Sequence, residues 1–96
     1  MSVRVVATIT ATPGSEQPVS DALVELARET QAEAGCQSYE LHRSAADPAV
    51  FVTVEQWTDR AALDAHMKTP HVQAAFAAVG DKLAVPPAIH PLEPLS

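Results

Sequence analysis

The chain has few of the residues and patterns on which several broad protein classes depend. It holds one cysteine, Cys36, so no intrachain disulfide can form, and we expect a reducing, cytoplasmic compartment. Its three glycines form no G-x-G-x-x-G or G-K-[ST] pattern, which leaves no phosphate-binding loop of the usual kind. No apolar run approaches the roughly 20 residues that cross a bilayer. The first residues also lack the long apolar core of a secretory signal.

Basic residues are scarce as well. Six Lys and Arg stand against twelve Asp and Glu, which gives a net charge of −6 and a pI near 4.9. This balance argues against binding to nucleic acid or to an anionic membrane surface. With 47% hydrophobic and 19% charged residues, the composition is that of a globular protein. The 96 residues predict a single domain over 1–96, and a chain this short buries only about 60–65% of its unfolded surface.

Periodicity predicts the element order β-α-β-β-α(α)-β. Alternating patterns predict strands at 3–12, 36–43, 49–57 and 88–92, and helical patterns predict helices at about 16–33, 60–68 and 70–83. Gly35 is expected to stop the first helix. The last strand lies among prolines, which cannot donate to a ladder, so we expect an edge strand or a pairing arm. This order is typical of the α+β ferredoxin-like fold, an antiparallel sheet with helices on one face.

The third predicted strand is apolar on both faces. One face carries three valines, Val50, Val52 and Val54. The other face carries a mixed set: Phe51, Thr53, Glu55 and Trp57. Helices cover only one face of such a sheet, so a monomer would leave an apolar face in water. We therefore expect a homodimer in which two sheets pack face to face.

Histidines are the first candidates for proton chemistry, because imidazole exchanges a proton near neutral pH. His66 and His71 bracket Pro70 in the segment AHMKTPH, where two helical pieces meet. His66 shares an apolar stripe with Leu63 and Met67, which predicts that it points inward. The alternative is an interior imidazole that only orders the bend.

The third strand supplies the other candidates. Glu55 could be a carboxylate in an apolar pocket that is suited to proton transfer, or an edge carboxylate that reaches solvent or pairs with arginine. Trp57 could be a flat wall for an aromatic ligand or part of the core. We expect His66 and Glu55 to form the proton-handling pair: if the two lie within hydrogen-bond reach, the carboxylate would hold the tautomer of the imidazole and raise its basicity. The remaining expected substrate contacts are Phe51, Tyr39, Phe76, Val72, Thr53 and His42, although His42 could equally lie on the surface.

A metal site is not expected from the spacing of possible ligands. The pattern H-x4-H is not H-E-x-x-H, and no third ligand follows at a diagnostic distance. Cys36 is expected to be a buried and inert thiol. The chain also lacks the nucleophile elbow of a serine hydrolase.

Two segments carry a family resemblance. VEQWTDRAALDAHMKTPHVQAAFAAV, together with GCQSYELHR, resembles the antibiotic biosynthesis monooxygenase family, and most of all its small quinol-monooxygenase branch, from Val3 to Leu92. The resemblance implies a dimeric α+β barrel with a pocket between sheet and helices. It also implies oxygenation of phenolic or quinol-type aromatics by O2 without metal, flavin or other prosthetic group. In the haem-degrading members a strand Asn and a helical His hold the haem; these positions fall on Ala7 and Phe76, so haem would lack its axial ligand.

The resulting hypothesis is a cofactor-independent monooxygenase that converts a phenolic or quinol-type aromatic to a quinone. His66, His71 or Glu55 would remove a proton from the substrate, and the phenolate would give an electron to O2 directly. Two alternatives stay open. One is an isomerase or tautomerase of a small oxygenated metabolite that uses the same residues. The other is a non-catalytic dimeric protein that binds a small molecule.

Overall fold

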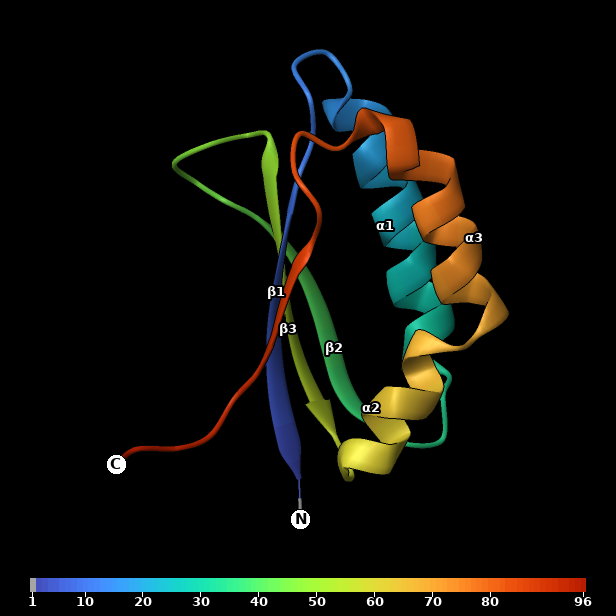
Figure 1. The fold of residues 1–96 in the computed structure, drawn as a ribbon, viewed down its shortest axis with the longest axis vertical. Helices are drawn as coiled ribbons and strands as arrows, with labels where there is room; N and C mark the ends of the chain where they lie inside the picture. Colours follow the sequence, from blue (N-terminus) through green and yellow to red (C-terminus); the bar gives the residue numbers. More distant parts are fainter. Residues whose placement is uncertain (1) are drawn as a thin grey trace.

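The sheet and helices follow the predicted order. The structure is a computed structural model that describes residues 2–96. Its elements are β1 (Val3–Thr10), α1 (Glu16–Gln31), β2 (Cys36–Arg43), β3 (Val50–Trp57), α2 (Arg60–Met67), α3 (Pro70–Val79), a 3₁₀ turn (Gly80–Lys82) and β4 (Ala88–Pro91). The strands form one antiparallel sheet in the order β2-β3-β1-β4, with α1, α2 and α3 on one side (Figure 1). This confirms the α+β ferredoxin-like prediction.

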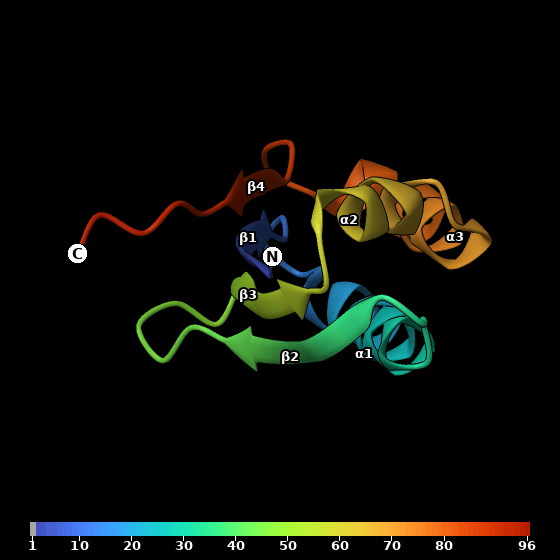
Figure 2. The same ribbon diagram turned by 90° about the horizontal axis from the view of Figure 1, so that it is seen from below.

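Only one face of the sheet is covered. Figure 2 shows the strands stacked edge to edge with the helices on one side, while the C-terminal segment extends away on the other side. On β3 the mixed face points to the helices, and Phe51, Thr53, Glu55 and Trp57 are all buried there. The valines of β3 lie on the open face and are half-buried. Because strand side chains alternate with a period of two, this register places a carboxylate under the helices.

The turn after α1 differs from the prediction. The helix ends at Gln31 instead of continuing to Glu33. The Glu33 backbone N–H donates to Thr30 O at 3.0 Å, and the Cys36 N–H donates to Glu33 O at 3.1 Å. Glu33 therefore sits in a hydrogen-bonded turn that leads into β2, and its side chain is free to turn toward the other helices.

Gly35 has a different role from the predicted helix stop. A Cβ atom at Gly35 would lie 2.5 Å from the Ala62 Cβ of α2, so only glycine allows this approach. Its backbone is not left-handed, since Gly14 has the single positive φ angle among residues 2–96. The Thr58 N–H also donates to Gly35 O at 3.0 Å. These contacts fix the turn that carries Glu33 against α2.

The junction between α2 and α3 is built around Thr69. Its hydroxyl donates to His66 O at 2.7 Å and accepts from the Val72 N–H at 3.4 Å, which caps α3. Pro70 occupies the first position of α3, where its missing N–H costs nothing. The third helix ends at Val79, earlier than predicted. Within residues 2–96, none of the helices combines the length and apolar character that crossing a membrane requires.

Candidate functional site

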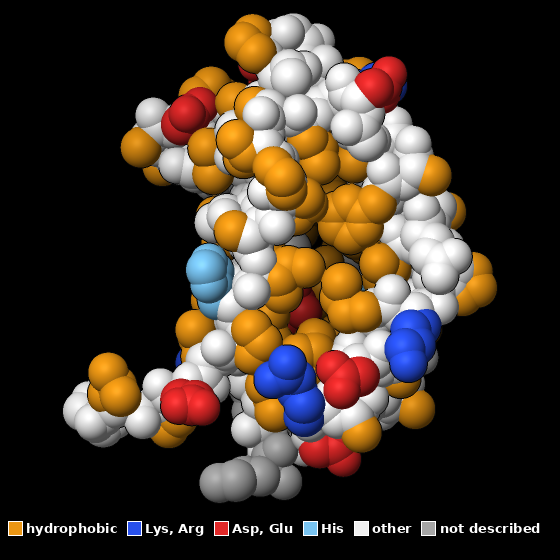
Figure 3. Space-filling view, in the orientation of Figure 1, with side chains coloured by type: hydrophobic (Ala, Val, Ile, Leu, Met, Phe, Trp, Pro, Cys, Tyr) orange, Lys and Arg blue, Asp and Glu red, His pale blue; other side chains and the backbone are white. Residues whose placement is uncertain are grey.

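A cavity lies between the helix-covered face of the sheet and the helices. Its free volume is about 30 Å³, which is room for about two water molecules. An open hollow of about 510 Å³ adjoins it and shares Phe76, Pro87 and Ile89 with it. Figure 3 shows the opening surrounded by hydrophobic side chains. The cavity is lined by Ala7, Ile9, Leu23, Leu26, Tyr39, Thr53, Glu55, Leu63, His66, Met67, Val72, Phe76, Pro87 and Ile89.

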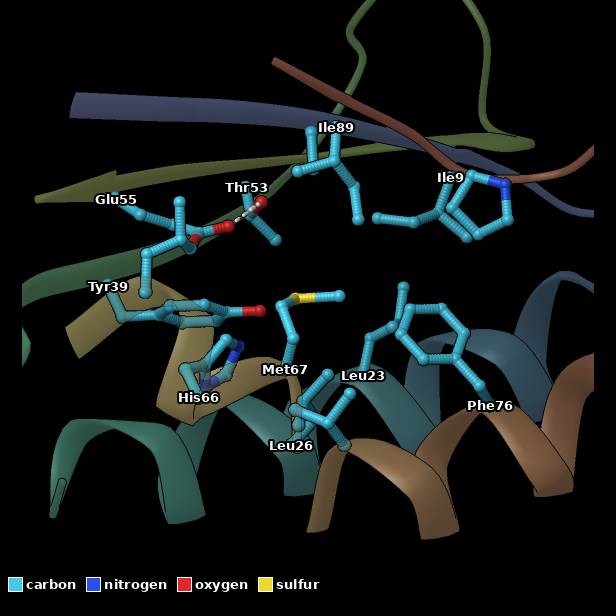
Figure 4. A pocket seen from close by; sticks show the side chains of 14 residues that line it. Ile9, Leu23, Leu26, Tyr39, Thr53, Glu55, His66, Met67, Phe76 and Ile89 are labelled. Carbon is cyan, nitrogen blue, oxygen red and sulfur yellow. Dashed lines mark hydrogen bonds between the residues drawn. The ribbon is translucent and has the colours of Figure 1, made fainter. Parts of the chain in front are cut away.

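The lining is divided into a polar end and an apolar end. Tyr39, Thr53, Glu55 and His66 lie together at one end, whereas Phe76 and other apolar side chains form the opposite end (Figure 4). The polar groups come from β2, β3 and α2, so they converge only in the folded chain. An apolar cavity with a few convergent polar groups is the usual form of a small-molecule site.

Both carboxylate oxygens of Glu55 accept hydrogen bonds from residues of its own strand, β3. Thr53 Oγ1 donates to one carboxylate oxygen at 2.6 Å, and Trp57 Nε1 donates to the other at 2.9 Å. Among residues 2–96 no hydrogen bond joins Glu55 to His66, so the condition under which Glu55 would hold the tautomer of that imidazole is not met. The physical reason is that residues 53, 55 and 57 lie on one face of the same strand, where they meet each other first.

The carboxylate partner of His66 is Glu33, which was not among the residues predicted for the site. His66 Nδ1 lies 2.6 Å from Glu33 Oε2, and His71 Nε2 lies 2.7 Å from the same oxygen. The side chains of His66 and Glu33 are 5% and 16% exposed, so the pair is largely shielded from water. No local pattern pointed to Glu33, because a glutamate near the end of an amphipathic helix is usually solvated.

This contact fixes the orientation and tautomer of His66. A carboxylate can only accept, so in the neutral ring Nδ1 carries the proton and the lone pair is on Nε2. Nε2 has no hydrogen-bond partner among residues 2–96, and no fully enclosed side-chain nitrogen or oxygen there lacks one. Nε2 therefore borders free space, and the space that His66 lines is the cavity. The ring packs on Trp57 with centroids 4.6 Å apart, which further restricts its motion.

Tyr39 supplies a hydroxyl beside this imidazole. Its ring centroid lies 6.1 Å from that of His66, and its hydroxyl points into the cavity (Figure 4). Burial, followed by the nearby Glu55 carboxylate, raises the pKa of Tyr39 well above its usual range. The phenol therefore stays protonated at neutral pH and can donate a hydrogen bond to a bound molecule.

The other predicted site residues divide between the cavity and the rest of the molecule. Val72 and Phe76 line the cavity, as Thr53 does. Phe51 and Trp57 are buried in the core and do not line it. His71 lies on a neighbouring surface hollow, and His42 is exposed, with its Nε2 3.0 Å from Glu40 Oε1.

Cys36 is half-buried, and burial, followed by the charge of Glu33, raises the pKa of its thiol.

The comparison with protein families gives one match over most of the chain. The family model described as antibiotic biosynthesis monooxygenase matches residues 2–78. The Mycobacterium tuberculosis protein named "Putative monooxygenase Rv0793" is 37% identical over 93 residues, which cover 97% of this chain and 91% of that protein.

Solved structures share the fold over nearly their full length. The structure of Rv0793 superposes with a TM-score of 0.90 at 35% identity and covers 100% of this chain and 97% of its own. PA3566 from Pseudomonas aeruginosa superposes with a TM-score of 0.91 at 35% identity and covers 99% and 95%. A crystal structure described as an antibiotic biosynthesis monooxygenase has a TM-score of 0.91 at 28% identity and covers 98% and 99%.

Proposed function

The chain belongs to the antibiotic biosynthesis monooxygenase family, and on this premise we propose that it oxidises a small phenolic or quinol-type aromatic compound to a quinone with O2 in the cavity. The observation that carries the proposal is the Glu33–His66 pair. In the neutral imidazole it leaves the lone pair on Nε2 of His66, which borders the polar end of the cavity. A carboxylate behind an imidazole also stabilises the imidazolium that forms when the base takes a proton.

The reaction needs no external reductant. His66 Nε2 takes the proton of the substrate hydroxyl, and the phenolate gives one electron to O2. The two resulting radicals combine at a ring carbon, and the peroxide receives the proton back from His66. Loss of the ring hydrogen and cleavage of the O–O bond release water and leave a new carbonyl. For a phenol the balance is phenol plus O2 to quinone plus water. General base catalysis of this kind contributes about 100- to 10,000-fold in rate.

Tyr39 and Glu55 have different parts in this proposal. The Tyr39 hydroxyl lies in the cavity as a donor, and it would stabilise the negative oxygen of the phenolate. Glu55 is a positioning residue, because both of its oxygens are occupied by Thr53 and Trp57. Through Trp57 it holds the surface on which the His66 ring rests.

The size of the cavity limits the substrate. A space for about two waters cannot hold an aromatic ring without side-chain movement. Met67 is 38% exposed and lines the cavity, so a rotamer change there would enlarge it at low cost. The adjoining hollow past Phe76 and Ile89 could take a substituent or a second ring. We propose a substrate of one or two rings whose hydroxyl reaches the polar end.

A homodimer through the open sheet face is part of the same proposal. Val6, Val52 and Val54 are half-buried on that face, although no helix of residues 2–96 covers it. The C-terminal segment extends on the same side, with Leu95 99% exposed (Figure 2). A second copy packed there would bury the valines and give this segment a surface to contact.

Oxygen consumption tests the proposed reaction. The protein would be mixed with a panel of simple hydroquinones and naphthols, and O2 uptake, quinone absorbance and ¹⁸O incorporation from ¹⁸O₂ would be measured. The expected result is one quinone per O2, with ¹⁸O in the ring and no hydrogen peroxide. Peroxide with unlabelled quinone would indicate autoxidation and contradict the proposal.

An experiment on the same protein under nitrogen distinguishes the isomerase alternative from oxidation. His66 and Tyr39 would also suit acid–base chemistry on an enolisable compound. Hydrogen–deuterium exchange into such a compound without O2, together with no oxygen uptake on the phenol panel, would favour that alternative over oxidation.

A further inference from the structure

Three metal-binding side chains converge beside the cavity. Glu33, His66 and His71 each offer one ligand atom, and all three atoms lie within 4.8 Å of one another. A metal was not expected from the sequence, because the spacing His-x4-His had no third ligand. The fold supplies this ligand from a turn more than thirty residues earlier in the chain. Two imidazoles and a carboxylate form a donor set that suits zinc and other first-row divalent ions.

The present distances are close to those of a metal site. Bond lengths of about 2.0–2.2 Å to nitrogen and oxygen place neighbouring ligand atoms of a tetrahedral site about 3.4 Å apart. Glu33 Oε2 now lies 2.6 Å from His66 Nδ1 and 2.7 Å from His71 Nε2. If each of these two distances increased by less than about 1 Å, an ion could take the place of the two protons that the histidines now share with Glu33. Each histidine already presents a ring nitrogen toward the carboxylate.

The ligands are held on ordered elements. The turn with Glu33 is clamped to α2 by the contact between Gly35 and Ala62. His66 belongs to α2, and His71 is in the first turn of α3. The hydroxyl of Thr69 bonds to His66 O and caps α3, so it fixes the relative position of the two histidines. Ligands that need little rearrangement make a stronger metal site.

The cluster of Glu33, His66 and His71 also has a path to solvent, and acidic side chains line this path. His71 lines an open surface hollow of about 300 Å³ that also contains Glu25 and Glu29, and no lysine or arginine lines it. The side chain of His71 is 20% exposed. Glu25 is itself paired with Arg28, so Glu29 is the carboxylate at the entrance that would favour a cation. Water from the hollow can complete the coordination.

From this geometry we propose that Glu33, His66 and His71 form a binding site for a divalent transition metal ion of the zinc class. The metal would bind on the side of His66 that faces away from the cavity. A metal on Nδ1 requires the ring proton of neutral His66 to move to Nε2. His66 would then donate into the cavity instead of accepting, so the metal-bound protein would lose the base. This last consequence rests on the proposed function, whereas the binding itself does not.

Cobalt binding tests the site without any turnover. Tag-free protein treated with a chelator would be titrated with Co²⁺, and the visible d–d absorption would give stoichiometry and affinity, with Zn²⁺ as competitor. The expected result is one ion per chain, with absorption typical of four or five ligands and a rise in melting temperature. Absence of a one-to-one complex would overturn the proposal.

Variants assign the ligands. His71→Gln and Glu33→Gln should each weaken Co²⁺ binding by about 100-fold or more, since loss of supporting contacts alone costs 10- to 100-fold. The matched control is His42→Gln, which removes the other histidine–glutamate pair, an exposed one with Glu40. Circular dichroism and melting curves would confirm that each variant folds. Unchanged binding in folded His71→Gln would contradict the proposal, as would loss of binding in His42→Gln.

Turnover separates this inference from the proposed function. If the protein oxidises phenols, stoichiometric Zn²⁺ should inhibit it, and a chelator should restore the rate. If it binds Co²⁺ but never consumes O2, the proposed function fails while the metal site stands. Oxidation without any metal binding would overturn the metal site and leave the proposed function intact.

Discussion

Glu33 Oε2 accepts hydrogen bonds from two imidazoles, and the one from His66 Nδ1 spans 2.6 Å. Because of this contact, the other nitrogen of the neutral His66 ring is a lone-pair acceptor at the polar end of the cavity. The pair joins the turn after α1 to α2 and links the fold to the proposed chemistry. Substitutions at these residues, and in the packing that holds them together, have distinct expected effects.

Replacement of His66 should affect turnover more than replacement of Glu33. We expect His66→Ala to lower kcat by about 100- to 10,000-fold, because the base is lost. Glu33→Gln keeps an acceptor for Nδ1–H but removes the charge that stabilises the imidazolium, so we expect a smaller loss, about 10- to 100-fold. Steady-state kinetics across pH would measure both effects. The control is His42→Ala, whose full activity would show that exposed histidines do not contribute; full activity in His66→Ala would refute the assignment of the base.

Tyr39 should make the protein less stable at alkaline pH. Its pKa in the folded chain is raised above the value of 10.0 for the free side chain. The stabilising contribution is therefore complete below pH 10.0 and is lost as pH rises through the folded pKa, with a limiting slope of about 1.4 kcal/mol per pH unit. Urea unfolding between about pH 9 and 11 would measure it. Tyr39→Phe should show a flatter pH dependence; an equal slope in both proteins would contradict the prediction.

Gly35→Ala should destabilise the protein through a clash. The added Cβ would meet the Ala62 Cβ at 2.5 Å, so the turn or α2 must shift. We expect a loss of about 1–3 kcal/mol in the free energy of unfolding. Gly80→Ala is the matched control, because nothing lies within 4 Å of its added Cβ, and it should be neutral or slightly stabilising. Denaturant unfolding of both variants, and partial rescue of Gly35→Ala by Ala62→Gly, would test the contact.

Val54→Lys should prevent the proposed dimer. Val54 pairs with Val6 at the centre of the open sheet face, and a lysine there would place a charge in the middle of the interface. Light scattering after size exclusion should show a dimer for the parent protein and a monomer for the variant. Val24→Lys changes an exposed valine on α1 and should remain dimeric. A monomeric parent protein at micromolar concentration would be evidence against this interface.

Much of the fold was predictable because its signals are local. Alternation in 49–57 predicted a strand with a valine face and a mixed face, and the structure has both in β3. The stripe that includes Leu63 predicted that His66 points inward, and its side chain is 5% exposed. Helical patterns on either side of Pro70 predicted α2 and α3; in the structure Asp59 caps α2 and Pro70 begins α3, and both effects depend on neighbouring residues only.

The hydrogen bonds of Glu55 were also within reach of the sequence. The spacing T-x-E-x-W places residues 53, 55 and 57 on one strand face, where a carboxylate between two donors tends to bind both of them. The sequence interpretation instead pairs Glu55 with His66 on the next element, on condition that the two lie within hydrogen-bond reach. The nearer partners occupy the carboxylate, because they need no tertiary contact to be placed beside it.

The sequence by itself determined the element order, the two-faced sheet and the inward direction of His66, because hydrophobic periodicity is a property of consecutive residues. The tertiary structure alone decided that Glu33, and not Glu55, would hold that imidazole. The contact joins positions 33 residues apart. It depends on where α1 ends and on how closely Gly35 lets the turn approach α2. The distance between the Glu33 and His66 side chains follows from packing, and no periodic pattern in the sequence indicates it.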